Sequence, residues 1–189
     1  YVYQPAGAHH LKRVNMFAFY QNSSTEQASE LVRQSLGPNP SPFFRTRDSM
    51  FEQSTFGFHA QFDHQFEWGG QHYLIYGLSF ETTESEGLRE GQTQDQATST
   101  PIPECDGVPA RDCTLSKLSE QSIFIQDEIQ LLDGRLLLSP GLRYDRFKLS
   151  PESDLLFETA NPGVEVSSFE DSQLSKKLGV VYLLSESYN

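Results

Sequence analysis

The sequence LLDGRLLLSPGLRYDR, from Leu131 to Arg146, carries the clearest indication of the fold class of this chain. Asp-Gly between two apolar runs is a strong short-range signal for a tight β-hairpin. In the strand that follows, apolar residues alternate with a polar face that carries Arg143 and Asp145. A strand of a soluble sheet covers its apolar face with a second layer of protein. The sequence therefore raises two questions: what covers this apolar face, and what satisfies the charges on the other one.

Alternation with a period of two residues recurs along the chain and predicts β-strands. It is clearest in 55–68, where Phe56, Phe58 and Phe62 share one face with Trp68, opposite a face that includes His59. Seven stretches alternate in this way or end such a stretch: 1–4, 12–21, 55–68, 72–83, 122–132, 135–146 and 177–185. No helical stripe of useful length occurs, so we predict an all-β chain.

The connections between these stretches alternate strictly in length. Short connections at 5–10, 68–71 and 132–135 alternate with long ones at 22–49, 84–116 and 150–176. A soluble sandwich with Greek-key connections has no reason to keep this parity. An outer-membrane barrel does, because its periplasmic turns are short and its extracellular loops are long. We therefore predict an antiparallel, up-and-down transmembrane β-barrel, with lipid against the apolar faces and a wet lumen or a plug against the polar ones.

Aromatic residues at both ends of the predicted apolar band favour the same fold. Phe66 and Trp68 lie at the short-turn end of their strand, whereas Phe80 and Tyr144 lie toward the long-loop end of theirs. Rings in these two places are typical of strands that cross a membrane interface. The alternative is that the rings fill the core of a soluble all-β ligand-binding module.

Composition excludes several classes of protein. The chain has 189 residues and a formal net charge of -12, which argues against binding to nucleic acid phosphates. The mean hydropathy of -0.51 leaves no segment as apolar as a membrane helix. The chain starts at Tyr1 in the middle of a pattern and without a leader, so we expect it to be a piece of a longer protein.

Cys105 and Cys113 lie close together in PECDGVPARDC, a polar stretch rich in Pro, Gly and Asp. A close pair in an exposed loop predicts a small disulfide and an oxidising compartment. Two free thiols or half of a zinc site are the alternatives. No histidine lies nearby and the chain has no second pair, which counts against zinc.

The motif SIFIQDEIQL, followed by GRLLLSPGLRYDRFKLSP, resembles a strand pair of the TonB-dependent outer-membrane receptors. The segments YVYQP, FYQNSSTEQ, QSTFGFHAQF and HYLIYGLSFETT resemble the haem and haemoglobin receptor branch of that family, and SKKLGVVYLLSESYN resembles the strand that follows. The resemblance implies an outer-membrane receptor, not an enzyme, that takes up haem or haemoprotein iron with energy from the TonB complex. A ferric siderophore is the alternative ligand, and no bound cofactor is implied.

The resemblance also implies a domain organisation and a set of partners. Residues 1–189 correspond to the N-terminal part of the barrel domain, about seven strands of a barrel of twenty-two. The plug domain, which contacts the TonB complex, and the remaining strands are expected outside this chain. The expected partners are outer-membrane lipid, lipopolysaccharide, the TonB complex and a host haemoprotein, but not nucleic acid.

Candidate ligand-binding regions are the three long loops, 22–49, 84–116 and 150–176. The last two contain acidic runs, whose expected role is to keep exposed loops solvated, with calcium binding or electrostatic steering of a cationic partner as alternatives. These acidic residues are Glu81, Glu84, Glu86, Glu90, Glu152, Asp154, Glu158, Glu165, Glu170 and Asp171.

None of the five histidines is predicted to ligate haem, because none is expected near the extracellular mouth. His59 is expected to face the lumen. His64 and His72 fall on the lipid-facing side near the short turns, and His9 and His10 in a periplasmic turn. Asp127 interrupts the apolar face of its strand.

The chain by itself is expected to form a curved sheet that is open at both edges. Its apolar face would be larger than soluble monomers tolerate, and its edges would aggregate. This face comprises Phe56, Phe58, Phe62, Leu74, Leu78, Ile123, Ile125, Leu136 and Leu138.

Overall fold

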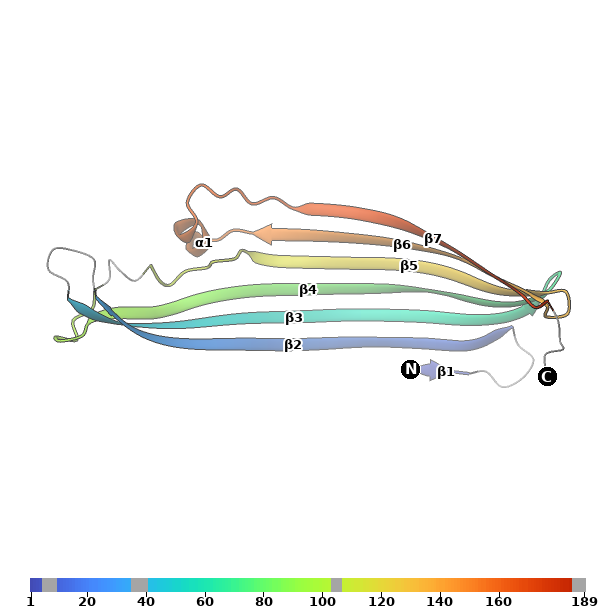
Figure 1. Ribbon diagram of the computed structural model, residues 1–189, viewed down its shortest axis with the longest axis horizontal. Coiled ribbons are helices and arrows are strands. Elements are labelled where there is room, and N and C mark those ends of the chain that lie inside the picture. Colours follow the sequence, from blue (N-terminus) through green and yellow to red (C-terminus); the bar gives the residue numbers. More distant parts are fainter. Residues whose placement is uncertain (5–9, 35–40, 103–106, 185–189) are drawn as a thin grey trace.

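The computed structural model describes residues 1–4, 10–34, 41–102 and 107–184, which form one curved antiparallel sheet (Figure 1). Its seven strands follow the order β1-β2-β3-β4-β5-β6-β7, so each strand pairs with its neighbours in sequence. The strands are β1 (Val2–Tyr3), β2 (Leu11–Gln34), β3 (Pro42–Glu67), β4 (Gln71–Asp95), β5 (Leu115–Leu131), β6 (Leu136–Glu152) and β7 (Phe169–Tyr182). This topology confirms the predicted all-β, up-and-down fold class.

The Asp-Gly hairpin is confirmed, with a turn that begins one residue earlier than the dipeptide. Leu131 pairs with Leu136, and the backbone N–H of Gly134 donates to the carbonyl of Leu131 at 3.1 Å. Leu132, Asp133 and Gly134 have φ of 54°, 55° and 85°. Two central residues with positive φ match the twist of the flanking strands. A leucine therefore occupies a backbone conformation that Asn, Asp or Gly usually adopts.

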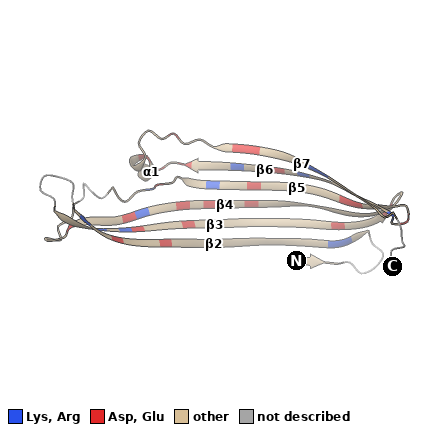
Figure 2. Cartoon of the chain, viewed as in Figure 1, with Lys and Arg blue, Asp and Glu red and all other residues tan. Residues whose placement is uncertain are grey.

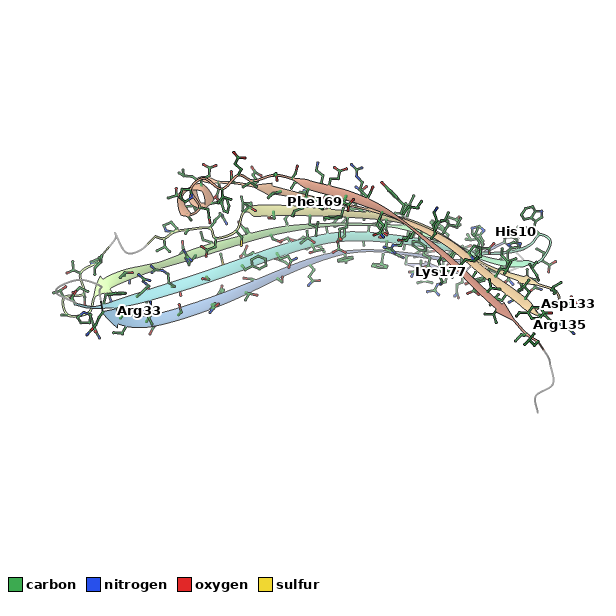
Figure 3. The ribbon with its side chains drawn as sticks, turned by 45° about the horizontal axis from the view of Figure 1, so that its top comes forward. His10, Arg33, Asp133, Arg135, Phe169 and Lys177 are labelled. Carbon is green, nitrogen blue, oxygen red and sulfur yellow. The ribbon has the colours of Figure 1, made fainter. Side chains whose placement is uncertain are left out.

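The short and long connections lie at opposite ends of the sheet, as the loop parity predicts. Asp133, Arg135 and His10 mark the short-turn end in Figure 3, and Arg33 marks the other end. The long-loop end also carries the one-turn helix α1 (Leu155–Ala160) between β6 and β7. The described part of the chain contains no helix with the length and apolarity that a membrane crossing requires.

The predicted loop 22–49 is largely wrong, and the predicted loops 84–116 and 150–176 are too long. β2 and β3 continue as a paired ladder as far as Gln34 and Pro42, and β4 continues to Asp95. β7 starts at Phe169, which leaves 153–168 as the connection after β6. Each of the first three long strands has 24 to 26 residues. A tilted crossing of a bilayer needs only about 9–11 residues.

The missed strand extensions have a simple physical reason. Where both faces of a strand meet water, no alternation of apolar and polar residues marks it, so a sequence such as NSSTEQASE in β2 resembles a loop. The backbone ladder continues because pairing with the neighbouring strand satisfies its N–H and C=O groups.

The pairing register confirms the two predicted faces. One row across six strands consists of apolar residues: Met16, Ala60, Leu78, Ile123, Tyr144 and Leu174. The neighbouring row points to the other face: Phe17, His59, Ser79, Ser122, Asp145 and Gln173. We call the side of the first row the apolar face and the side of the second row the polar face.

The sheet is a single layer, and no hydrophobic core covers its apolar face. Among the described residues, the buried hydrophobic side chains are only Ala60, Ala110 and Phe157. Phe56, Ile123 and Leu178 on the apolar face are 48%, 59% and 71% exposed. The soluble sandwich alternative does not fit this arrangement, because a sandwich buries one face of each sheet.

Candidate functional site

A hollow of about 500 Å³ lies against the polar face in the middle of the sheet. Its aromatic side is formed by Phe17, Phe19 and His59 from β2 and β3, and its acidic side by Glu81, Glu120 and Asp171 from β4, β5 and β7. These side chains come from strands far apart in sequence because the meander brings them into adjacent rows. The prediction that His59 lies on the polar face is confirmed.

The aromatic side of the hollow is a continuous stack of rings. The His59 ring lies 5.1 Å from the Phe17 ring and 6.4 Å from the Phe124 ring, measured between centroids. Phe17 also stacks with Phe19 at 6.3 Å. No hydrogen bond to the His59 imidazole occurs within the described residues, and Phe17 is 48% exposed. This exposed aromatic wall on an otherwise polar face is a candidate binding surface.

Two glycines make room for this wall. The Phe19 ring crosses Gly57, where a Cβ would lie only 2.2 Å from a ring carbon. The Phe124 ring crosses Gly77, where a Cβ would lie 2.9 Å from a ring carbon and 2.4 Å from the carbonyl oxygen of Ala60. Both glycines therefore shape the hollow by letting a ring lie flat on the backbone.

Gly77→Ala is expected to destabilise the assembled protein by about 1–3 kcal/mol, because the new methyl overlaps a backbone oxygen that cannot rotate away. Gly141→Ala provides a matched control on the polar face of β6. Its Cβ would meet nothing nearer than 3.6 Å, an ordinary contact. Urea unfolding of the two full-length variants in detergent measures the difference. Equal midpoints would show that the strands separate freely at Gly77.

The acidic side of the hollow concentrates uncompensated charge. Glu81 and Glu120 are directly opposite each other in the β4–β5 ladder. Neither makes an ion pair within the described part of the chain, and like charges in opposed positions destabilise a sheet. Arg143 and Asp145, by contrast, satisfy each other through an Nη2–Oδ1 contact of 2.8 Å. This pair answers the second question that the hairpin sequence raised.

Two of the remaining histidines lie on the apolar face, as predicted. The His64 ring contacts the Tyr76 hydroxyl at 3.3 Å. His72 is only 7% exposed, and its Nδ1 lies 2.6 Å from Oδ2 of Asp127. This contact explains why Asp127 interrupts the apolar face of β5. His10 is exposed near the carbonyl of Gln65, and His9 lies outside the described residues.

At the long-loop end, Arg111 joins the connection after β4 to the connection after β6. Its Nε donates to Oδ2 of Asp154 at 2.6 Å, and its Nη1 donates to the carbonyl of Gly87 at 2.9 Å. Asn161 donates to the Arg111 carbonyl at 3.0 Å. Asp154 is also the N-cap of α1 and accepts from the backbone N–H of Phe157. No sequence pattern marks Arg111, because its partners lie tens of residues away along the chain.

Arg111→Ala is expected to open this loop cluster, with a local loss of about 2 kcal/mol from the hydrogen bonds of a largely buried guanidinium. Lys117→Ala is the matched control. Lys117 pairs with Glu84, but both side chains are more than half exposed, and such pairs contribute about 0–1 kcal/mol. Limited proteolysis of the full-length protein measures cleavage within 153–168. Faster cleavage in both variants, or in neither, contradicts this role of Arg111.

The contacts of Asp154 in this loop cluster should stay intact in moderate acid. The backbone N–H of Phe157, and then Arg111, hold the pKa of Asp154 below its ordinary value. A lowered pKa in the folded state contributes stability above the unfolded pKa, and this contribution is lost as pH falls through the folded pKa. Proteolysis of 153–168 should therefore accelerate only below about pH 4. Faster proteolysis between pH 7 and pH 5 would mean that the protonation of another group, and not of Asp154, opens the loop cluster.

The predicted acidic runs do not act as one group. Glu84 and Glu170 pair with Lys117 and Arg146, Glu86 lies 3.5 Å from Arg111, and Glu158 accepts from Ser153. The rest are exposed except Glu81 on the polar face and Asp154 beside Arg111, which are half-buried. The described residues contain no group of three or more side chains able to hold a metal ion.

The structure gives no support to the predicted disulfide. Cys113 is exposed with a free thiol, and Cys105 lies outside the described residues. A bond between Cys105 and Cys113 stays a prediction, and thiol labelling of intact cells without reductant tests it. Modification of both cysteines would exclude the bond.

Comparison with known proteins gives one finding about the whole sheet. Residues 3–189 match a family model described as TonB dependent receptor-like, beta-barrel. No curated protein matches the chain.

Proposed function

The chain belongs to the TonB-dependent receptor-like β-barrel family, and we propose that it forms part of a receptor that takes up haem or haemoprotein iron. Proteins of this family are transporters of the bacterial outer membrane that work with the TonB complex. The apolar face is therefore the lipid-facing side, and the polar face is the lumenal side. Lipid answers the first question that the hairpin sequence raised, since it covers the apolar face.

The aromatic wall of the lumenal hollow is the observation that supports haem as the ligand. Phe17, Phe19 and His59 present ring faces beside a space of about 500 Å³. Flat rings favour offset stacking on other flat rings, and a porphyrin is a flat, largely apolar ligand. A wall of this kind would guide such a ligand through the lumen. No residue of the chain is assigned as an iron ligand.

The acidic side of the same hollow supports a ferric siderophore as the second candidate. Glu81 and Glu120 carry uncompensated negative charge into the space. Haem has two propionates, which this charge repels. A neutral or cationic iron complex would meet no such repulsion.

A growth experiment separates the two candidates. The full-length receptor is produced in a strain that lacks its other iron-uptake receptors, with haem, haemoglobin or ferric siderophores as the sole iron source. Growth on haem or haemoglobin that depends on TonB supports the proposal. Growth on a siderophore alone supports the second candidate.

A binding experiment tests the role of the wall. Phe17→Ala should weaken haem binding by the purified full-length receptor about tenfold, because it removes one stacking face. Phe56→Ala is the control, since both phenylalanines are 48% exposed but Phe56 lies on the lipid-facing side. The change in haem absorbance during titration gives the dissociation constant of each variant. Equal dissociation constants would mean that the aromatic wall does not bind haem.

The same proposal includes a domain organisation and a partner outside the chain. Residues 1–189 would be an early part of the barrel domain, and a plug domain elsewhere in the protein would contact TonB. The strands that extend beyond the lipid, with their acidic surface, would meet a host haemoprotein. Capture of haemoglobin by whole cells should then weaken as salt rises, and binding that salt leaves unchanged contradicts this part.

A further inference from the structure

A groove of about 230 Å³ lies where β2, β3 and β4 extend beyond the membrane, on the side of the sheet that continues the lipid-facing side. Two adjacent rows of the register line it: Glu26, Met50 and Leu88 in one row, and Ala28, Asp48 and Glu90 in the other. We call it the outer groove. The outer groove combines apolar side chains with carboxylates.

The outer groove lies above the lipid headgroups. Met50 is six residues beyond Phe56, where the regular apolar alternation of β3 begins. At the rise of a strand and a barrel tilt of about 40°, this separation is about 15 Å in height. The headgroup layer of a bilayer is only about 5–8 Å thick on each side. The occupant of the outer groove is therefore to be sought among proteins or solutes outside the membrane.

Charge is fully segregated between the two sides of these strand extensions. Within 22–34, 42–54 and 82–94, every basic residue lies on the lumenal side: Arg33, Arg45, Arg47 and Arg89. In the same ranges every acidic residue lies on the side of the outer groove: Glu26, Glu30, Asp48, Glu52, Glu84, Glu86 and Glu90. Figure 2 shows acidic positions along the long-loop halves of all three strands. The field on this side therefore attracts a cationic partner.

The carboxylates of the outer groove have no cation to balance them. Asp48 and Glu90 lie directly opposite each other in the β3–β4 ladder, and like charges in opposed positions destabilise a sheet. Glu26 lies one row away, opposite Met50. All three acidic side chains are exposed, and none makes an ion pair within the described part of the chain. A cation placed between them would relieve the repulsion.

The apolar residues of the outer groove offer a partner a second kind of contact. Met50 is 37% exposed and lies opposite Leu88, which is half-buried. A lysine or arginine side chain covers such residues with its aliphatic stem while its charged end reaches a carboxylate. Hydrogen bonds between charged groups are roughly twice as strong as those between neutral groups. The outer groove therefore suits a basic side chain better than an inorganic cation.

We propose that the outer groove docks a basic protein that stands beside the barrel on the cell surface. A second copy of this chain is not the occupant, because copies related by an axis along the membrane normal would bring the same acidic sides together. A protein that delivers haem is not the occupant either, since the sheet itself would separate it from the lumen. This docking surface is independent of the ligand that the receptor transports.

The test uses the full-length receptor in neutral detergent and a fluorescent oligolysine peptide as the probe. Glu90→Gln should weaken peptide binding about fivefold, the upper range for one exposed ion pair. Glu165→Gln is the matched control, because it removes the same charge from an exposed residue in the connection between β6 and β7. Fluorescence anisotropy gives the dissociation constants. Equal dissociation constants for the two variants would show attraction to the net charge of the chain alone, which overturns the proposal.

Met50→Ala tests the apolar part of the outer groove. It should weaken binding of the same peptide about threefold, because it removes apolar contact with the lysine stems. Phe51→Ala is the matched control, since Phe51 is the next residue of β3, is 45% exposed and lies on the lumenal side. An equal effect of the two changes on peptide binding would contradict docking in the groove.

Two further measurements would reveal a different occupant. Haemoglobin capture by whole cells and the molecular mass of the receptor in detergent should both be unchanged by Glu90→Gln. Loss of haemoglobin capture would make the outer groove a haemoprotein site. A wild-type dimer that the variant dissociates would make a second copy the occupant. Either result overturns the proposal.

Discussion

Ile125→Lys is expected to lower the stability of the membrane-inserted receptor by about 2–4 kcal/mol, the cost of a cation placed on the lipid-facing side within the band. Ile125 is 46% exposed, and it pairs with Tyr76 and Leu142, which lie on the same side. The nearest carboxylate on this side is Asp127, two residues along β5, and it is already bound to His72. Unfolding by urea from lipid vesicles measures the loss.

Gln126→Lys is the matched control for this prediction. Gln126 is the next residue of β5 and points to the lumenal side, where it pairs with Ile75 and Gly141. Water in the lumen hydrates an ammonium, so the change should be close to neutral. Equal losses in the two variants would mean that the assignment of the two faces is wrong for β5. A larger loss for Gln126→Lys would mean that the faces are exchanged.

The sequence predicts the membrane-spanning part of this fold well because alternation there has a physical cause. Lipid on one side and water on the other select opposite residues at successive positions, so Phe56, Phe58 and Phe62 mark the face directly. The loop parity predicts the meander for a similar reason, since hairpin partners must return to the same side of the membrane. The structure confirms both the faces and the order of the strands.

The same reasoning fails beyond the membrane, where no difference between the two sides remains. The ends of β2, β3 and β4 carry mixed polar residues on both faces, and only the backbone ladder holds them as strands. The helix α1 is a single turn that depends on its cap, Asp154, and on Arg111 from another connection. A contact between positions 111 and 154 leaves no periodic trace in a single sequence.

The candidate site was predicted only in part. His59 was placed in the lumen from alternation alone, but its neighbours were not found. In the sequence, Phe17 and Phe19 put apolar rings on a face of 12–21 that should be polar. This exception is itself a signal, since these rings form the wall of the hollow. Exceptions to a regular pattern concentrate at functional or strained places.

Asp127 is a second exception of this kind, and its partner could not be predicted without the register. It lies in the middle of the apolar residues of β5, between Ile125 and Ile129. In the ladder it pairs with Leu74, two residue pairs away from His72 and on the same side of the sheet. His72 also contacts the carbonyl of Trp68 at 3.0 Å, and the Phe66 ring stacks on it at 4.8 Å. The His72–Asp127 pair therefore lies between the Phe66 ring and the tight turn that follows Trp68.

Asp127→Ala is expected to destabilise the membrane-inserted receptor by about 3 kcal/mol, because it leaves a buried imidazole without its partner on the lipid-facing side. Oδ1 of Asp127 is buried and has no hydrogen bond, so the intact pair already carries an unsatisfied atom. Replacing both residues together should therefore cost little stability. The double variant His72→Phe with Asp127→Leu should recover most of the loss, since it restores an apolar surface to the lipid. The double-mutant cycle comprises the wild type, His72→Phe, Asp127→Leu and the double variant, and their four urea midpoints in lipid vesicles give the coupling between the two residues. Additive losses in the cycle would mean that His72 and Asp127 act independently, and that the 2.6 Å contact contributes nothing to the stability of β4 and β5.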